Sequence, residues 1–250
     1  LTPADADRLK AAVEYAWEVY GETALGSGER IWSHALGMAL IITGLKLDGD
    51  SRVAALLFAI PSHDEHGLAN IEARFGKSVA HLVGGISRLN RLRPIARGFV
   101  AVNIEAGEVN PHEMKAQIEV LRKMLLAMVE DIRVVLLRLA SRTQTLRFYA
   151  AHPDELRVQV ARETLELYSP LANRLGVWEL KWELEDLSFR FMHPDTYKQV
   201  ARLLDEKRTE REQFITDAIT RLREELKAVG IEKAEIYGRP KHIYSIWNKM

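Results

Sequence analysis

The chain has 250 residues, of which 47% are hydrophobic and 28% are charged, and this composition is typical of a soluble globular protein. Its 35 basic residues balance 35 acidic residues, so it lacks the excess positive charge that favours direct binding to a nucleic acid. The absence of cysteine excludes disulfides, thiolate nucleophiles and cysteine zinc sites. No apolar stretch approaches the roughly 20 residues that cross a bilayer, so we expect no membrane contact.

The length and the first residues indicate one part of a larger protein. At roughly 150 residues per domain, the chain holds between one and two domains. It begins without an initiator methionine and without the basic and apolar segments of a signal peptide. We therefore expect a fragment of a longer protein that works in the cytoplasm.

Helical periodicity dominates residues 1–195, which we take as the first domain. Thr2 and Pro3 form a helix start, and apolar residues then recur at helical spacing as far as Tyr20. The same signals predict helices at about 31–47, 52–59, 68–75, 78–89, 110–128, 131–150, 153–172 and 177–192. Residues 93–110 are expected to form a long surface connection.

Residues 196–250 are predicted to contain a linker helix and the start of a second domain. Residues 205–213 include no apolar side chain, and an apolar stripe then resumes until Gly230, a pattern typical of an exposed helix between domains. One short strand over 231–237 and a helix from Pro240 are expected to follow.

Two features of the first domain could carry chemistry, although each has a simpler explanation. Four potential metal ligands occupy 63–66, but a proline and a glycine bracket them, and such a polar run more often forms a solvated turn. His34 lies in an apolar helical segment, where a single histidine is usually a hydrogen-bonded core residue.

A basic run beside the long connection leaves two alternatives open. Arg88, Arg91, Arg93 and Arg97 could bind phosphate or could pair with nearby acidic residues.

The C-terminus has the largest group of candidate phosphate-binding residues. In a helix that begins near Pro240, Lys241, Ser245 and Lys249 would share one face, with Arg239 at its entrance. Cations and a hydroxyl group at a helix start suit a polyphosphate, although a solvated basic face is the more common outcome of this spacing.

This C-terminal run resembles a motif of the RelA/SpoT-type (p)ppGpp synthetase/hydrolases, the bacterial stringent-response enzymes. Arg and Lys flank a proline, and Ser-Ile and Lys-Met follow. The resemblance implies that Arg239, Lys241, Ser245 and Lys249 bind ATP phosphates. Residues 163–187 are similar to the link between the family's two catalytic domains.

The resemblance implies an all-α, HD-domain-like helical bundle, followed by the linker helix and the truncated start of an α/β synthetase domain of the nucleotidyltransferase type. In the family, the HD-type domain is a Mn²⁺-dependent phosphohydrolase that removes the 3′-pyrophosphate of (p)ppGpp. The chain departs from the metal-ligand pattern of that domain. The positions concerned are Phe58 and Ala59 for the His-Asp pair, Ser62 and His63 for the Glu-Asp pair, Ser141 for the last aspartate, and His34, which alone still matches.

These departures predict a degenerate hydrolase pocket that holds no metal. One imidazole cannot bind Mn²⁺, which prefers several hard oxygen donors, and hydrolysis without a metal-activated water should be lost. Leu25 and Gly26 also stand where the family has the Arg-Lys pair that grips guanine. Phe58 and Ala59 can instead pack as ordinary core.

The pattern resembles the synthetase-only, ribosome-associated branch of the family. It implies a GTP diphosphokinase that transfers pyrophosphate from ATP to the 3′-hydroxyl of GTP or GDP with Mg²⁺, and that meets ribosome and tRNA through a region absent here. The family's Mg²⁺-binding Asp and its other catalytic residues would lie beyond Met250, so we expect the fragment alone to be inactive.

Two alternatives remain open. The first is an active metal phosphohydrolase with a displaced ligand set, in which His34 acts with His63, Asp64 or His66. The second is a regulatory helical module that binds a nucleotide or a partner domain.

Overall fold

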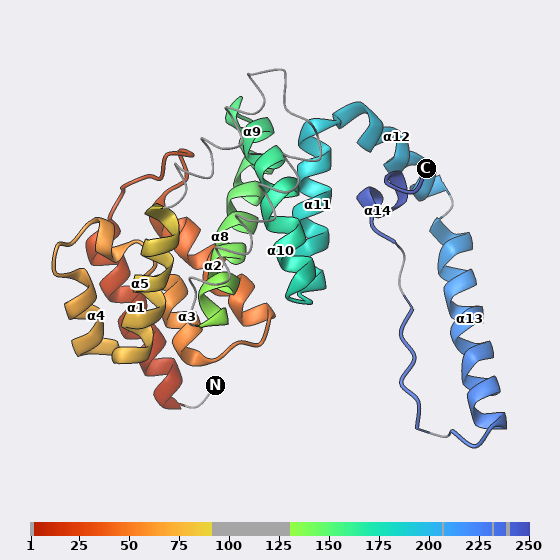
Figure 1. Cartoon of the computed structure of the whole chain (residues 1–250), viewed down its shortest axis with the longest axis horizontal. Helices are drawn as coiled ribbons and strands as arrows, with labels where there is room; N and C mark the ends of the chain where they lie inside the picture. The colour runs from red at the N-terminus through yellow and green to blue at the C-terminus, as the bar shows by residue number, and fades with distance from the viewer. Residues whose placement is uncertain (1–2, 92–130, 207, 232, 239–240) are drawn as a thin grey trace, which may run out of the picture.

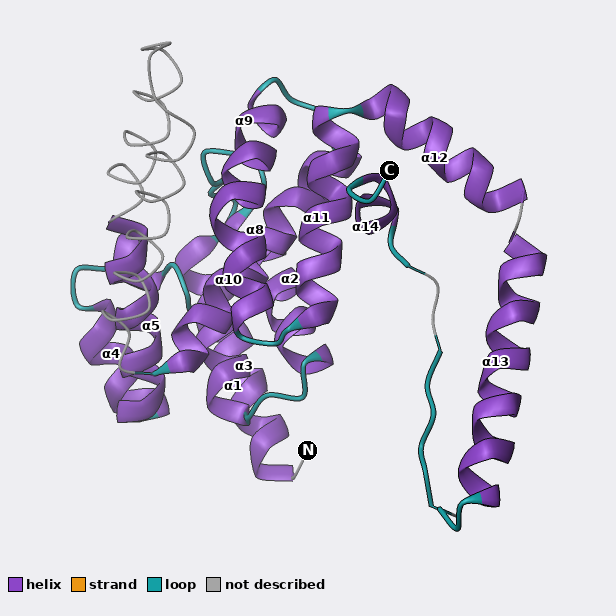
Figure 2. Ribbon diagram, turned by 45° about the vertical axis from the view of Figure 1, so that its right-hand side comes forward, coloured by secondary structure: helices purple, strands orange, loops and turns teal. Residues whose placement is uncertain are grey.

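The computed structural model describes residues 3–91, 131–206, 208–231, 233–238 and 241–250 (Figure 1). Every regular element among them is helical, as Figure 2 shows, and only an isolated bridge pairs Ala24 with Arg30. The α-helices are α1 (Pro3–Tyr20), α2 (Ile31–Gly44), α3 (Gly49–Leu56), α4 (Gly67–Phe75), α5 (Lys77–Arg91), α8 (Ile132–Ala151), α9 (Leu156–Glu163), α10 (Ser169–Arg174), α11 (Trp178–Met192), α12 (Pro194–Glu206), α13 (Arg208–Ala228) and α14 (Ile243–Trp247). A 3₁₀ turn spans Ile60–Ser62, and a π-helical turn spans Thr164–Tyr168. The prediction of an all-helical fold is confirmed.

Helix α8 runs through the centre of the bundle, with α2, α3 and α5 on one side and α9 and α11 on the other (Figure 1). Buried residues occur all around α8 instead of along one stripe, which is typical of a helix enclosed by others. One hydrophobic core extends from Ala12 in α1 to Phe191 in α11. The bundle therefore forms a single packed body around α8.

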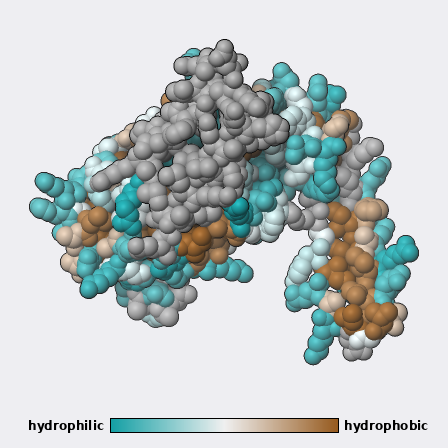
Figure 3. All heavy atoms as spheres, viewed as in Figure 1, coloured by the Kyte–Doolittle hydropathy of each residue, from teal (hydrophilic) through white to brown (hydrophobic). Residues whose placement is uncertain are grey.

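The helices after α11 lie at the edge of the bundle or outside it. Helix α12 packs on α11, whereas α13 stands apart and exposes Phe214 and Leu222. Figure 3 shows hydrophobic atoms gathered in the region of α13. The chain then returns, and α14 lies against α11 and α12 (Figures 1 and 2). None of the described helices is long and apolar enough to traverse a lipid bilayer.

Several boundaries differ from the prediction. The helix expected at 153–172 is broken into α9, the π-helical turn and α10, and the expected helix at 110–128 and connection at 93–110 lie outside the described residues. The strand predicted over 231–237 is wrong, because its described residues form no ladder with a neighbouring strand. A strand needs such a neighbour to satisfy its backbone groups.

The last predicted helix is shorter than expected. It covers only Ile243–Trp247, so Lys241 precedes it and Lys249 follows it. The prediction that Lys241, Ser245 and Lys249 share one face of a helix is therefore wrong, because only Ser245 lies within the helix.

One guanidinium connects two helix N-termini. Asp131 caps α8 by accepting the N–H of Arg133 at 2.9 Å, and the Arg133 guanidinium lies 2.6 Å from Asp131 and 2.5 Å from Asp48, the N-cap of α3. The hydrogen bond from the Arg133 side chain is the main cause that holds the pKa of Asp131 below its ordinary value. The starts of α8 and α3 are thus tied by the same ion pairs.

We expect Asp131→Ala to lower the free energy of unfolding at pH 7 by about 1 kcal/mol, the usual loss for an N-cap. Asp131→Asn should lose less, because its amide oxygen still accepts the Arg133 N–H. Since folding lowers the pKa of Asp131, its contribution is present above the unfolded pKa of roughly 3.9 and is lost as the pH falls below it. Urea unfolding should therefore separate wild type from Asp131→Ala less at pH 3 than at pH 7. An equal separation at both pH values would contradict a role for the ionised carboxylate.

Candidate functional site

A cavity of about 350 Å³ opens beside α8 in the middle of the bundle. It brings together positions that are far apart in the sequence: Leu25 and Gly26 before α2, His34 in α2, Phe58 after α3, and Ser141 in α8. These are among the positions that the sequence singled out for a hydrolase pocket, whereas Ala59, Ser62 and His63 do not line the cavity. The remaining lining comes from Ser27 and from α5, α8 and α9, including Asn90, Arg138, Arg142, Thr145 and Gln159.

His34 forms the floor of this cavity and is almost completely buried. Its Nδ1 lies 2.6 Å from Oε2 of Glu29, and its Nε2 lies 2.9 Å from Oγ of Ser141. The other carboxylate oxygen of Glu29 accepts the side-chain amide of Gln144 at 2.7 Å. A proton on Nδ1 satisfies the carboxylate and lets Nε2 accept the Ser141 hydroxyl. Both ring nitrogens are therefore already engaged by protein groups.

The two positions after α3 are filled by core side chains. The Phe58 ring lies 5.3 Å from the His34 ring, between centroids, and Ala59 is buried. The backbone N–H of Ala59 donates to the Tyr20 hydroxyl at 3.1 Å, and that hydroxyl donates to the carbonyl of Leu56 at 3.0 Å. Burial raises the pKa of Tyr20, so its phenol stays neutral. The structure thus shows ring packing and neutral hydrogen bonds at these two positions.

Two guanidinium groups line the opposite wall. Arg138 donates to the Tyr168 hydroxyl at 2.9 Å, and the Arg142 guanidinium lies 4.2 Å above the Tyr168 ring and 2.7 Å from the carboxylate of Glu163. Burial alone would raise the pKa of Tyr168, but the two arginines lower it below its ordinary value. Sequence reasoning missed both arginines. The available signal was their spacing of four residues on α8, which puts both on the face that carries Ser141.

The run at 63–66 forms a turn before α4 and lies away from the cavity. Asp64 accepts the Asn70 amide and the backbone N–H of His66, each at 2.9 Å, and these hydrogen bonds lower its pKa, the bond from Asn70 most. Nδ1 of His63 lies 3.0 Å from the carbonyl of Ala59. In the part of the chain that the structure describes, no three His, Asp or Glu side chains are grouped so that they could hold a metal ion.

The other sequence-predicted positions are dispersed or lie outside the description. Ser62 is exposed at the end of the 3₁₀ turn, and Arg88 is exposed on α5. Arg93, Arg97 and Arg239 lie outside the described residues.

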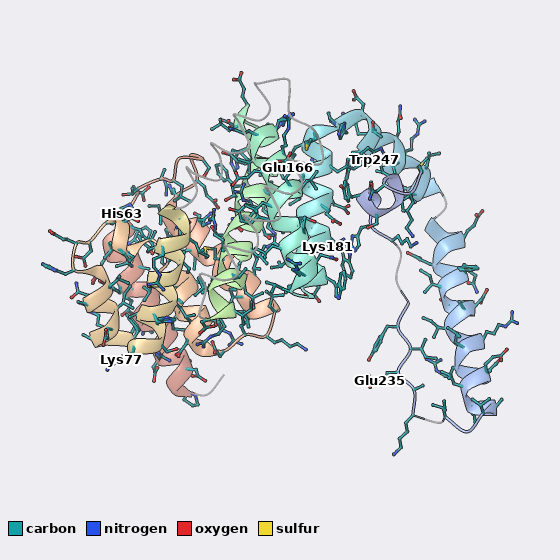
Figure 4. The ribbon with its side chains drawn as sticks, viewed as in Figure 1. His63, Lys77, Glu166, Lys181, Glu235 and Trp247 are labelled. Atoms are coloured by element: carbon teal, nitrogen blue, oxygen red, sulfur yellow. The ribbon has the colours of Figure 1, made fainter. Side chains whose placement is uncertain are left out.

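The C-terminal residues form a second, separate group. Ser245 lies in α14, while Lys241 and Lys249 flank it in sequence. The two lysine side chains lie together, and the hydrogen bond and positive charge from Lys249 lower the pKa of Lys241. Figure 4 places Trp247 of α14 and His63 on opposite sides of the molecule, with Glu166 between them. None of residues 241–250 lines the cavity, so the C-terminal group is a second polar site, distinct from the cavity.

Comparison with known proteins places this geometry in a family. The HD domain family matches residues 12–178, from the middle of α1 to the first residue of α11. The chain belongs to the HD-domain family. Over most of its length, its homologues are enzymes of the RelA/SpoT type.

The relatives carry two kinds of name. The chain is 43% identical over 214 residues, 85% of its length, to a GTP pyrophosphokinase of Escherichia coli strain K12. It is 36% identical over 248 residues, 99% of its length, to a guanosine-3′,5′-bis(diphosphate) 3′-pyrophosphohydrolase of Aquifex aeolicus. It spans only 27% and 33% of the length of these two relatives.

One solved structure was also compared, that of a metazoan ortholog of SpoT described as hydrolysing ppGpp. It matches 74% of this chain and 96% of its own with a TM-score of 0.47 and 18% identity.

We expect His34→Ala to lower the free energy of unfolding by about 3 kcal/mol, because Glu29 would keep a buried charge without its imidazole partner. Ser141→Ala should cost only about 1 kcal/mol, since it removes one hydrogen bond and leaves that pair intact. Urea unfolding of both variants at pH 7 measures the difference. Equal losses would show that the His34–Glu29 pair is not the main stabilising contact of the floor.

Proposed function

We propose that residues 1–195 form an HD-type domain that has lost metal-dependent hydrolysis, and that residues 196–250 form a linker helix and the first part of a (p)ppGpp synthetase domain. The whole protein would be a GTP diphosphokinase of the stringent response. It would transfer pyrophosphate from ATP to the 3′-hydroxyl of GTP or GDP. The HD-type domain would then support or regulate its neighbour.

The observation that carries this proposal is the floor of the cavity. HD-domain hydrolases depend on a metal ion. The residues here do not fit one, because both nitrogens of His34 are hydrogen-bonded and because Phe58, Ala59 and Ser141 offer no carboxylate or imidazole. Mn²⁺ prefers several hard oxygen donors. We therefore assign no hydrolytic step to this cavity.

The second polar site supports the synthetase part of the proposal. Lys241, Ser245 and Lys249 would bind ATP phosphates together with Arg239, and the two neighbouring ammonium groups would offset the phosphate charge. The hydrogen bond from Lys249, together with the positive charge of Lys249, lowers the pKa of Lys241, and an anion between the two lysines would offset that charge.

Mg²⁺ would stabilise the developing charge of the reacting phosphates. No described group of acidic side chains would hold it, so its ligands would come from elsewhere in the protein. Ribosome, tRNA and a cytoplasmic setting belong to the same proposal, and they rest on the family alone.

The displaced-ligand alternative has no support in the described geometry. His34 is buried at the cavity floor, whereas His63, Asp64 and His66 lie in a turn where Asp64 is engaged by Asn70 and His66. The regulatory alternative is compatible with the proposal, since an HD-type domain that no longer hydrolyses its substrate can still regulate the adjacent synthetase domain.

The first test measures metal and hydrolysis. Protein purified without chelator and then dialysed against Mn²⁺ should retain far less than one ion per chain and should release no pyrophosphate from ppGpp. Retention of about one Mn²⁺ that is lost in His34→Ala, together with turnover, would contradict the proposal and favour the displaced-ligand hydrolase.

A rebuilt site gives the matched positive control. The triple variant Phe58→His, Ala59→Asp and Ser141→Asp restores the family's ligand types around His34, so we expect it to bind Mn²⁺ and to gain thermal stability when Mn²⁺ is added, by mass action. Wild type and Phe58→His alone should show neither effect. A folded triple variant that neither binds Mn²⁺ nor gains thermal stability from it would show that these positions do not meet around His34 as we propose.

In the full-length protein, Lys241→Ala should raise the KM for ATP by roughly tenfold or more, the usual cost of a lost charged hydrogen bond. Initial-rate synthesis of ppGpp from ATP and GDP measures it, with exposed Lys233→Ala as the control. An unchanged KM for ATP would exclude Lys241 from the phosphate site.

A further inference from the structure

One face of α11 carries a row of side chains that meets the segment around α14. Trp182, Asp186, Phe189 and His193 follow one another at spacings of four, three and four residues, so they share this face. Each of them contacts residues in the range 242–247. The row therefore serves as a platform for that segment.

Asp186 makes the polar contacts of the platform. Its Oδ1 accepts the backbone N–H of Tyr244 at 2.9 Å, and its Oδ2 lies 3.4 Å from Nδ1 of His242. The Tyr244 N–H belongs to the first turn of α14, where backbone donors lack a partner within the helix. His242 is the N-cap residue of α14, but its side chain makes no capping hydrogen bond. Asp186 thus caps α14 from another helix, 58 residues earlier in the chain.

Aromatic rings complete the platform on both sides of Asp186. The Trp182 and His242 rings stack with centroids 4.7 Å apart and planes 17° apart. The Phe189 ring lies 4.6 Å from the Trp247 ring and 5.8 Å from the Tyr244 ring. These contacts orient the segment along α11, so the side of α14 that faces the platform is fixed.

Helix α14 depends on this platform for its position. It has five residues, and none of them is buried. A helix of this length is unstable by itself in water, because nucleation costs more than so few hydrogen bonds return. The external cap and the ring contacts must therefore supply most of the order of residues 242–247.

We propose that Asp186 is a positioning residue for ATP binding: by holding the Tyr244 N–H and His242, it keeps residues 242–247 on α11 and so presents Lys241, Ser245 and Lys249 in the arrangement that receives the phosphates. This inference rests on the proposed function. Asp186 would not touch ATP. Asp186 acts through the backbone of residues 242–247, and the flanking Lys241 and Lys249 supply the positive charge for the phosphates.

Hydrogen exchange on the 250-residue chain tests the contact itself. In Asp186→Ala, the amide of Tyr244 should exchange at least tenfold faster than in wild type. Asp186→Asn should restore most of the protection, because its side-chain oxygen still accepts the Tyr244 N–H. Glu183→Ala is the matched control on the same helix, since Glu183 pairs with Arg147 of α8 instead. Equal exchange in Asp186→Ala and Glu183→Ala would overturn the proposal.

Steady-state synthesis by the full-length protein tests the role. Asp186→Ala should raise the KM for ATP about tenfold with less than a twofold change in kcat, and Asp186→Asn should stay close to wild type. A KM for ATP that is unchanged in Asp186→Ala would overturn the positioning role while the proposed function stands. A full-length wild type that makes no ppGpp from ATP and GDP would overturn the proposed function itself.

Discussion

The buried pair of His34 and Glu29 is the contact on which the centre of this structure depends. A carboxylate and an imidazole are stable in an apolar core only when their hydrogen bonds are satisfied, and α8 supplies both missing partners through Ser141 and Gln144. Helix α2 approaches α8 so closely that a Cβ on Gly37 would lie 2.1 Å from the Gln144 side-chain oxygen. The pair therefore fixes the spacing of the two helices as well as the cavity floor.

That constraint decides the chemistry of the cavity. With both nitrogens of His34 bonded, the polar character of the cavity comes from its other wall, where Arg138 and Arg142 meet Tyr168 in the π-helical turn. The next residue, Ser169, donates to Glu185 of α11 at 2.7 Å, and Asp186 follows Glu185 directly. Tyr168 and Ser169 therefore connect the cavity wall to α11, the helix on which α14 packs.

Local patterns predicted the helical elements well, and they failed where a distant partner decides the outcome. The N-cap at Asp131 was not singled out, yet the start of α8 was placed within one residue because apolar periodicity begins there. The strand expected at 231–237 did not form, because its described residues have no neighbouring strand with which to build a ladder. The helix expected from Pro240 begins at Ile243 instead, where Asp186, a residue distant in sequence, accepts the first-turn N–H of Tyr244.

The sequence by itself determined the helical class, the family resemblance and the apolar or hydroxyl side chains at Phe58, Ala59 and Ser141, since these follow from local periodicity and residue identity. Only the tertiary structure decided what His34 contacts, because Ser141 and Gln144 are 107 and 115 residues away from His34 and Glu29. It likewise decided that Arg138 and Arg142 share the cavity wall and that Asp186 holds α14. Hydrogen bonds between distant segments depend on how helices pack, and no local pattern encodes that packing.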